Sequence, residues 1–170
     1  MFIHNRPQQT GAVLVISLIM LLLLTLIGVT GTQVTGLEEK MAGNMRNRNL
    51  AFQAAESALR DGERFLTQAT LPNFTTTGAG GLYELTGTPP TARDDWSGFN
   101  KITYLPGDPA ALGALAANPQ YVIQRLPSFG GSGDSLEAGV FTESEMYRVT
   151  ARGVGGTADA VVVVQSNYKR

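Results

Sequence analysis

The stretch Ala12–Ile27, which reads AVLVISLIMLLLLTLI, decides the fold of this chain. With its uncharged continuation to about Val34 it is long enough to cross a bilayer as one helix, because a span needs roughly 20 apolar residues. The leader Met1–Thr10 is polar, and Arg6 is its only firm charge. A basic residue before a span favours a cytoplasmic N-terminus, so we expect the C-terminal part of the chain to be exported.

Three interpretations of this segment are open from the residues alone. A cleaved signal peptide has an apolar region of about 7–15 residues and a small-residue cleavage site, whereas this segment is longer and lacks the best sites of that kind. A plain signal anchor fits its length and its flanks. In the third interpretation a peptidase cuts before the membrane segment, at Gly11, which separates the polar leader from the apolar run.

The apolar pattern continues beyond the span at helical spacing, with charged residues mostly between its members. Glu56 and Arg60 are four residues apart in the favourable order, and Leu71-Pro72 marks a boundary because the residue before proline avoids the helical region. We therefore expect one helix from about Ala12 to Ala69, amphipathic in its second half. Glycines should bend or locally melt it, and they are Gly28, Gly31, Gly36 and Gly43.

Period-two alternation replaces the helical pattern after Thr70 and predicts β-strands. We expect a C-terminal hairpin of Tyr147–Val154 and Ala158–Ser166 around the turn signal Gly155-Gly156. In this hairpin Val149 and Ala151 should face the core on one strand, as should Val162 and Val164 on the other. The run of valines from 161 to 164 suggests a strand buried on both faces. Two further strands are expected at Tyr121–Leu126, ended by Pro127, and at Lys101–Leu105, with turn-rich connections at Thr86–Pro90 and Phe129–Gly139.

These elements predict an α+β fold, in which the long N-terminal helix packs on an antiparallel β-sheet. About 100 residues follow Thr70, enough for one modest domain with its own core. The lone tryptophan, Trp96, is expected to be a half-buried anchor of that core.

Composition excludes several functions. With 13 basic and 14 acidic residues the net charge is −1, so the chain lacks the excess of basic residues that is typical of nucleic-acid-binding proteins. The absence of cysteine excludes disulfides and thiol nucleophiles. The single histidine, His4, lies in the leader, so the remainder has no imidazole for a triad or a metal site. Ser57 has no base near it in sequence.

The acidic pairs of the body lack the spacing of a calcium loop, and we interpret them as solvated surface: Asp94-Asp95, Asp134 with Glu137, and Glu143 with Glu145. We therefore expect no enzyme activity, no metal site and no cofactor.

Two helical motifs carry a family resemblance. The polar leader ending in Gly11, the apolar helix, Leu37–Asn44 (LEEKMAGN) and Ala51–Leu59 (AFQAAESAL) resemble the N-terminus of type IV pilins. More narrowly, they resemble the PilX-type minor pilins. The resemblance is strong over about Gly11 to Arg64 and fair over the last twenty-five residues, whereas Pro72–Asn118 shows no resemblance that can be named.

The resemblance implies how the chain is processed and divided. Prepilin peptidase would cut after Gly11 and methylate the new N-terminus at Ala12. The chain would then comprise a leader (1–11), a transmembrane and assembly helix (12–36), its amphipathic continuation (37–69) and a periplasmic β-sheet domain (70–170). The residues expected to serve the assembly helix are Ile16, Leu37, Glu38, Glu39, Met41, Phe52, Ala55, Glu56 and Leu59.

One position departs from the family pattern. Major pilins carry a glutamate five residues into the mature chain, where this sequence has Ile16, and the first carboxylate after the cut is Glu38. In the family that glutamate is thought to meet the N-terminal amine of a neighbouring subunit. A subunit without it loses this attraction when it joins beneath others, but loses nothing if it is laid down first. The departure favours a place at the pilus tip and a part in initiating assembly.

The expected function is therefore a minor pilin of a type IV pilus. The alternatives are a pilus-borne adhesin or binding module and a pseudopilin of a type II secretion system. The implied partners are other minor pilins, the major pilin, prepilin peptidase and, before assembly, the inner membrane, with no nucleic acid. The chain would first be a single-pass inner-membrane protein with a periplasmic C-terminal domain, and later part of the extracellular pilus.

Overall fold

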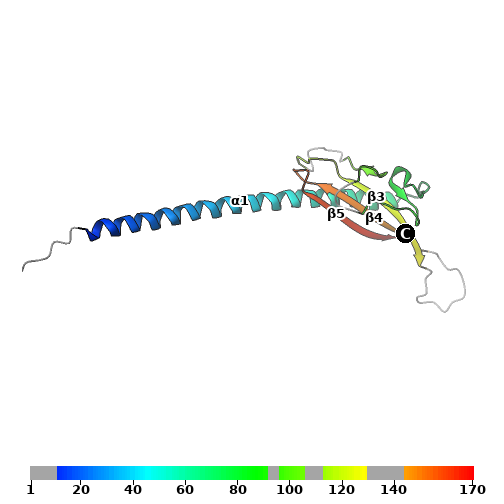
Figure 1. Cartoon of the computed structure of the whole chain (residues 1–170). Coiled ribbons are helices and arrows are strands. Elements are labelled where there is room, and N and C mark those ends of the chain that lie inside the picture. The colour runs from blue at the N-terminus through cyan, green and yellow to red at the C-terminus, as the bar shows by residue number, and fades with distance from the viewer. Residues whose placement is uncertain (1–10, 92–95, 106–112, 130–143) are drawn as a thin grey trace, which may run out of the picture. The chain divides into compact units, whose positions relative to one another are not determined.

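The computed structural model describes residues 11–91, 96–105, 113–129 and 144–170. The helix α1 (Ala12–Leu66) is followed by a short 3₁₀ turn (Ala79–Gly81) and five strands: β1 (Leu82–Tyr83), β2 (Ile102–Thr103), β3 (Gln120–Phe129), β4 (Ser144–Val154) and β5 (Val161–Lys169). The chain divides into two compact units, Met1–Gly43 and Asn44–Arg170. The first unit contributes the N-terminal part of α1 and the second contains its C-terminal part and the sheet (Figure 1).

The expected α+β fold is confirmed, but one strand pair is parallel rather than antiparallel. The sheet order is β1-β3-β4-β5, and β2 also pairs with β3. The β2–β3, β3–β4 and β4–β5 pairs are antiparallel, whereas β1 runs parallel to β3 through Leu82↔Ile123 and Tyr83↔Gln124. The two-residue β1 was not expected from the sequence, because no run of alternating residues marks it.

The boundaries of the helix and of β3 differ from those expected. The helix ends at Leu66 rather than Ala69, because tighter bonds from Thr67 N to Arg64 O (3.1 Å) and from Gln68 N to Phe65 O (3.3 Å) close its last turn. It is continuous through the four glycines where bends or melting were expected. Pro127 does not end β3, because a register shift between Leu126 and Phe129 accommodates a residue without an N–H.

The other strand boundaries differ for local reasons. The expected strand at 101–105 is reduced to the two residues of β2. β5 begins at Val161 rather than Ala158, because residues 157–160 form a turn that is closed by a bond from Ala160 N to Thr157 O (3.1 Å). It extends to Lys169, and a bond from Arg170 N to Glu145 O (2.8 Å) continues the ladder. The expected connection at 129–139 and the acidic residues Asp94, Asp95, Asp134, Glu137 and Glu143 lie outside the described residues, except for the backbone of Phe129 in β3.

The sheet buries side chains on both faces. On the α1 face a core cluster joins helix and strand residues, namely Ala58, Leu59, Leu66, Leu82, Tyr121, Ile123, Tyr147, Val149 and Ala151. On the opposite face a smaller cluster contains Tyr83, Trp96 and Val122. Trp96 is therefore a core residue as expected, and at 2% exposure it is more deeply buried than predicted.

The C-terminal hairpin meets most of its expectations. Val149 and Ala151 are fully buried on the α1 face of β4. Val164 packs against the same cluster from β5, but it is only partly buried, and so is Val162. All four valines of 161–164 are half-buried rather than enclosed, because β5 is the last strand of the sheet.

Backbone-to-backbone contact joins α1 to β4. The helix presents Ala51, Ala54, Ala55, Ala58 and Gly62, all buried, to the sheet. A Cβ atom on Gly153 would lie 2.1 Å from the carbonyl oxygen of Ala51 and 2.5 Å from the amide nitrogen of Ala55. Gly155 approaches Asn47 O in the same way, at 2.3 Å from the hypothetical Cβ. Small residues on both elements therefore form a close-packed seam.

We expect Gly153→Ala to destabilise the body, because the added methyl group meets helix backbone that cannot rotate away. Overpacking of this kind typically costs about 1–3 kcal/mol. Thermal unfolding of the full-length chain in detergent, followed by circular dichroism, measures the loss. Gly98→Ala is the matched control, since a Cβ at Gly98 meets nothing within 4 Å. Equal unfolding temperatures for the two variants would contradict the close contact.

Candidate functional site

The junction between leader and helix is open. Gly11 is the last residue before α1, is exposed, and would have no atom within 4 Å of an added Cβ. Ala12 is the first residue of the helix. The residue before the apolar helix is therefore accessible and lies outside the helix.

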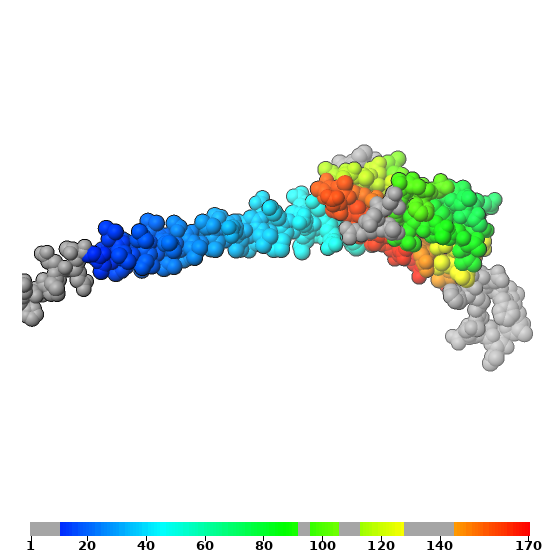
Figure 2. All heavy atoms as spheres, viewed as in Figure 1, coloured from blue at the N-terminus to red at the C-terminus, as the bar shows by residue number. Residues whose placement is uncertain are grey.

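The N-terminal part of α1 has the surface of a membrane helix. All of its described side chains in the first unit are exposed, and Ile16 is 56% exposed. Figure 2 shows the atoms of this segment in blue. By length and composition this helix could cross a membrane. Its hydroxyl groups bond to its own backbone: Ser17 Oγ donates to Leu14 O (2.9 Å), Thr25 Oγ1 to Leu22 O (2.8 Å), and Thr30, Thr32 and Thr35 bond similarly. Hydrocarbon offers no hydrogen bonds, so such internal pairing suits a bilayer.

The first of the two helical motifs is fully exposed. Leu37 and Met41 are 59% and 57% exposed in the first unit. Glu38 and Glu39 lie on the same segment and are also exposed. Among the described residues the ion pairs are Arg64–Asp61 and Arg125–Glu145, so neither glutamate has an ionic partner there. This segment therefore presents large apolar side chains and unpaired carboxylates on one exposed stretch of helix.

The second motif, Ala51–Leu59, serves two purposes in the second unit. Its alanines and Leu59 are buried against the sheet, with Ala55 at 0% and Leu59 at 8% exposure. Phe52 is 48% exposed, and Glu56 is half-buried without an ion pair to Arg60 in the described part of the chain. Of the residues expected to serve assembly, Ala55 and Leu59 therefore stabilise the chain's own body, and Phe52 remains available to a partner.

Polar contacts fasten the end of the helix to the sheet. Tyr121 Oη donates to Asp61 Oδ2 (3.1 Å), and Ser166 Oγ donates to Glu63 Oε1 (2.7 Å). The guanidinium of Arg170 donates to the carbonyl oxygens of Gln68 and Ala69 (2.8 and 3.1 Å), which lie just past the helix. No local pattern in the sequence indicates these contacts, because the partners are about 60 to 100 residues apart.

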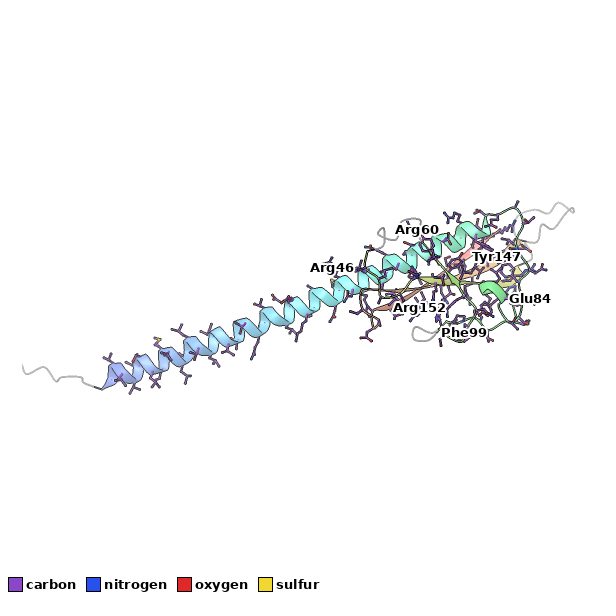
Figure 3. The ribbon with its side chains drawn as sticks, turned by 90° about the horizontal axis from the view of Figure 1, so that it is seen from above. Arg46, Arg60, Glu84, Phe99, Tyr147 and Arg152 are labelled. Carbon is purple, nitrogen blue, oxygen red and sulfur yellow. The ribbon has the colours of Figure 1, made fainter. Side chains whose placement is uncertain are left out.

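Burial and neighbouring carboxylates raise the pKa of two tyrosines, Tyr121 and Tyr147. Burial, and then the negative charge of Asp61 and the bond to it, raise the pKa of Tyr121 well above its usual value. Burial and the bond from Tyr147 Oη to Glu145 Oε2 (2.7 Å) raise the pKa of Tyr147 to about 12. Both rings are therefore held neutral in the folded state. Figure 3 shows Tyr147 on the sheet with Arg46 and Arg60 extending from α1.

The described residues offer little for chemistry. They contain no group of three or more histidine, cysteine or acidic side chains that could hold a metal ion. Ser57 Oγ donates to the carbonyl oxygen of Gln53 (2.8 Å), so its hydroxyl is used inside the helix. What the chain presents instead are surfaces: an accessible junction, an apolar helix and exposed apolar residues on its continuation.

Two family models match adjoining parts of the chain. The model described as PilX N-terminal matches residues 10–60. The model described as Type IV pilus assembly protein PilX C-term matches residues 67–170, so it includes Pro72–Asn118, where no resemblance was expected. No curated protein matches the chain, and no solved structure matches it.

The bond between Tyr121 and Asp61 predicts a loss of stability at alkaline pH. Because folding raises the tyrosine pKa above the unfolded value of about 10, the unfolded state releases its protons first and stability falls as the pH rises beyond 10. Tyr121→Phe should lower stability at pH 7 by about 1 kcal/mol and make the alkaline loss shallower. Chemical denaturation between pH 7 and 11 measures both effects. Adding Tyr147→Phe should flatten the profile further, and an unchanged slope would contradict the assignment.

Proposed function

The chain belongs to the PilX family of type IV pilus assembly proteins, and from this premise we propose that it is a minor pilin placed near the pilus tip, where it helps to initiate assembly. The family is a structural one, and pilus components are its implied partners. The observation that carries the proposal is Ile16 at the fifth position of the proposed mature chain, where major pilins have a glutamate.

Processing is the first step of this proposal. Prepilin peptidase removes residues 1–11 by cutting after Gly11 and methylates Ala12. The support is the exposed glycine directly before the first helical residue. Residues 12–36 then hold the protein in the inner membrane as a single span, and the body is periplasmic. The self-bonded hydroxyls of the apolar segment support this location.

Assembly then replaces lipid by neighbouring helices around the same apolar surface. The exposed side chains of Ile16, Leu37 and Met41 are the proposed contacts in the first unit, with Glu38 and Glu39 setting which partner helix is accepted. In the second unit Phe52 is the proposed contact. Other minor pilins and the major pilin are the proposed partners, because their helices have the same apolar character.

The proposed place of this subunit in the pilus rests on the absence of a carboxylate at Ile16. A subunit joining beneath others needs its carboxylate to meet the N-terminal amine of the subunit above. A carboxylate in hydrocarbon costs about 3 kcal/mol, so it is worth keeping only where that amine is available. A subunit laid down first has no earlier neighbour above it. Isoleucine at this position suits that place, since it avoids the desolvation cost.

Gly11→Leu should block maturation, because a bulky side chain at the junction prevents the backbone from entering the peptidase. Intact-mass spectrometry of the purified protein should give a wild-type chain beginning at methylated Ala12 and a variant chain retaining Met1. Gly11→Ala is the size control and should still be cut, at least in part. A wild-type chain that keeps its leader in assembled pili would refute the processing step.

Loss of the protein should reduce the number of pili more than their length, because initiation and not elongation is impaired. Immunogold labelling of sheared pili should find the wild-type protein at one end of each filament. Ile16→Glu should lower its abundance or move label into the shaft, since the new carboxylate needs an amine partner. Ile16→Gln, polar but uncharged, is the control and should keep the end position. Regular wild-type labelling along the shaft would exclude the tip.

A further inference from the structure

The outer edge of β5 is open. β5 is the last strand in the order β1-β3-β4-β5, and no other strand of the described residues pairs with it on that side. Its nine residues contain no proline, and no charge precedes Lys169. Natural sheets usually protect such an edge with prolines, charges or bulges, because unpaired N–H and C=O groups recruit further strands. This edge has none of these before its last residue.

The ladder with β4 shows which backbone groups face outward. Hydrogen bonds from Gly155 N to Ala160 O and from Arg170 N to Glu145 O, both 2.8 Å, lie at the two ends of the hairpin. Bonded and non-bonded pairs alternate in an antiparallel ladder. The even-numbered residues of β5 therefore bond to β4, and the odd-numbered residues point their N–H and C=O groups to the open edge. Val163, Gln165 and Asn167 are the central members of that outward set.

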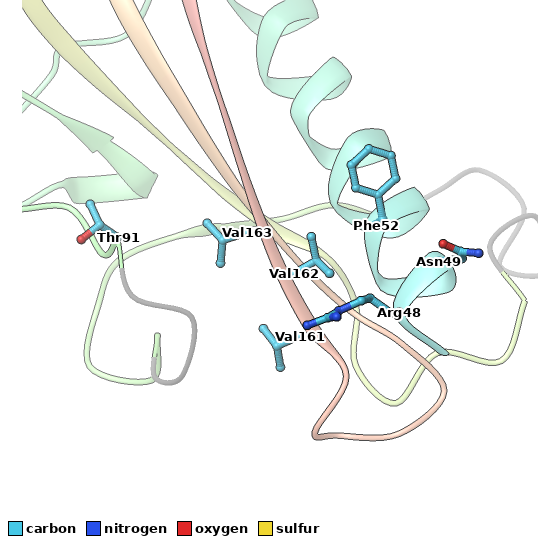
Figure 4. Close-up of a pocket in the computed structure, with 7 residues that line it drawn as sticks. All are labelled: Arg48, Asn49, Phe52, Thr91, Val161, Val162 and Val163. Atoms are coloured by element: carbon cyan, nitrogen blue, oxygen red, sulfur yellow. The ribbon is translucent and has the colours of Figure 1, made fainter. Parts of the chain in front are cut away.

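A groove of about 480 Å³ lies beside the first residues of this edge. Its lining comes from α1 and from both faces of β5, with Thr91 on the far side: Arg48, Asn49, Phe52, Thr91, Val161, Val162 and Val163. In Figure 4 Val162 lies toward Phe52, whereas Val161 and Val163 lie on the side of Thr91. A groove lined from both faces of an edge strand continues the plane of the sheet, which is where an added strand would lie.

We propose that the edge of β5 binds an extended strand of a different protein, which continues the sheet by main-chain hydrogen bonding. An apolar side chain of that strand enters the groove beside Phe52 and Val162, and a carboxylate of the same strand pairs with Arg48. Arg48 is exposed and forms no ion pair with the described residues, so its charge is available. Phe52, at 48% exposure, gains burial on binding.

Charge argues against a second copy of this chain as the occupant. Antiparallel pairing of two β5 strands about Gln165 would bring Lys169 and Arg170 of one copy to the Val161 end of the other, where Arg48 lies. The exposed Asp159 also lies at this end, but Arg48 would face two basic side chains of the second copy and no carboxylate side chain of its β5. A strand that carries a carboxylate there is attracted instead.

Site-specific photo-crosslinking in cells that make pili tests the strand geometry with the full-length protein. A benzophenone amino acid replaces Gln165 in one strain and Asn167 in another, since both side chains are exposed on the same face of β5. The crosslinked peptides are sequenced by mass spectrometry. We expect both strains to capture one protein, at positions that differ by two residues. Crosslinks without this spacing, no crosslink, or a product of two copies of this chain would each overturn the proposal.

A matched pair of variants tests the edge itself. Gln165→Pro and Gln165→Ala both remove the bond from Gln165 Nε2 to Thr150 Oγ1 (3.0 Å), but only proline removes the outward N–H. With the crosslinker at Asn167, proline should reduce the yield about tenfold relative to alanine, as expected for a loss of about 1.4 kcal/mol. Equal yields would overturn the proposal. If Gln165→Pro does not accumulate, Asn167→Pro against Asn167→Ala, with the crosslinker at Gln165, makes the same comparison.

Charge reversal tests the carboxylate. Arg48→Glu should lower the crosslink yield, whereas Arg60→Glu, also exposed on α1 but outside the groove, should not. Equal effects would refute the pairing with Arg48. These readouts are independent of pilus number and of position along the filament, so the proposed tip function and the edge interaction can fail separately.

Discussion

The contact of α1 with β4 is the constraint on which the body depends. Gly153 and Gly155 leave no side chain between strand and helix, and alanines on the helix complete the fit. At this separation even one methyl group would overlap backbone atoms of Ala51 or Ala55. Interiors this dense transmit strain rather than absorb it, so an added side chain at Gly153 would displace neighbouring backbone. The bonds from Tyr121 to Asp61 and from Ser166 to Glu63 then fix its end.

The same contact divides the helix into an inner and an outer face. Over residues 51–58 the alanines lie on the side that meets the sheet, and the residues between them are more exposed. Phe52 is the clearest case: it adjoins buried Ala51 in sequence but is 48% exposed. A pilin needs such a division, because one helix must hold its own domain and also meet neighbouring subunits. In the proposed function the inner face is permanent, whereas the outer face exchanges lipid for protein.

Among the described residues, the sheet edge at β3 is partly paired, whereas the edge at β5 is open. β1 and β2 both pair with β3, so the edge beyond β3 is at least partly covered. β5 has no such cover among the described residues, and its valines remain half-buried. A continuous run of valines is typical of a strand that is packed on both faces. The composition of β5 thus suits a strand inside a larger sheet better than a strand at an edge, which is why a partner strand is the occupant that we propose.

The sequence by itself determined the long helix, the C-terminal hairpin and the α+β class, because each rests on a local period: 3.6 residues along the helix, and two along Tyr147–Val154. It also determined the family resemblance, since the two helical motifs are contiguous. Tertiary structure alone decided what depends on distant partners. The parallel pairing of Leu82 and Tyr83 leaves no pattern in two residues, and Pro127 continues a strand only because the ladder shifts there. Within the motif Ala51–Leu59, Ala55 is buried and Phe52 is exposed. This difference depends on Gly153, nearly a hundred residues later, because only the folded chain brings the glycine backbone against the Ala55 side of the helix.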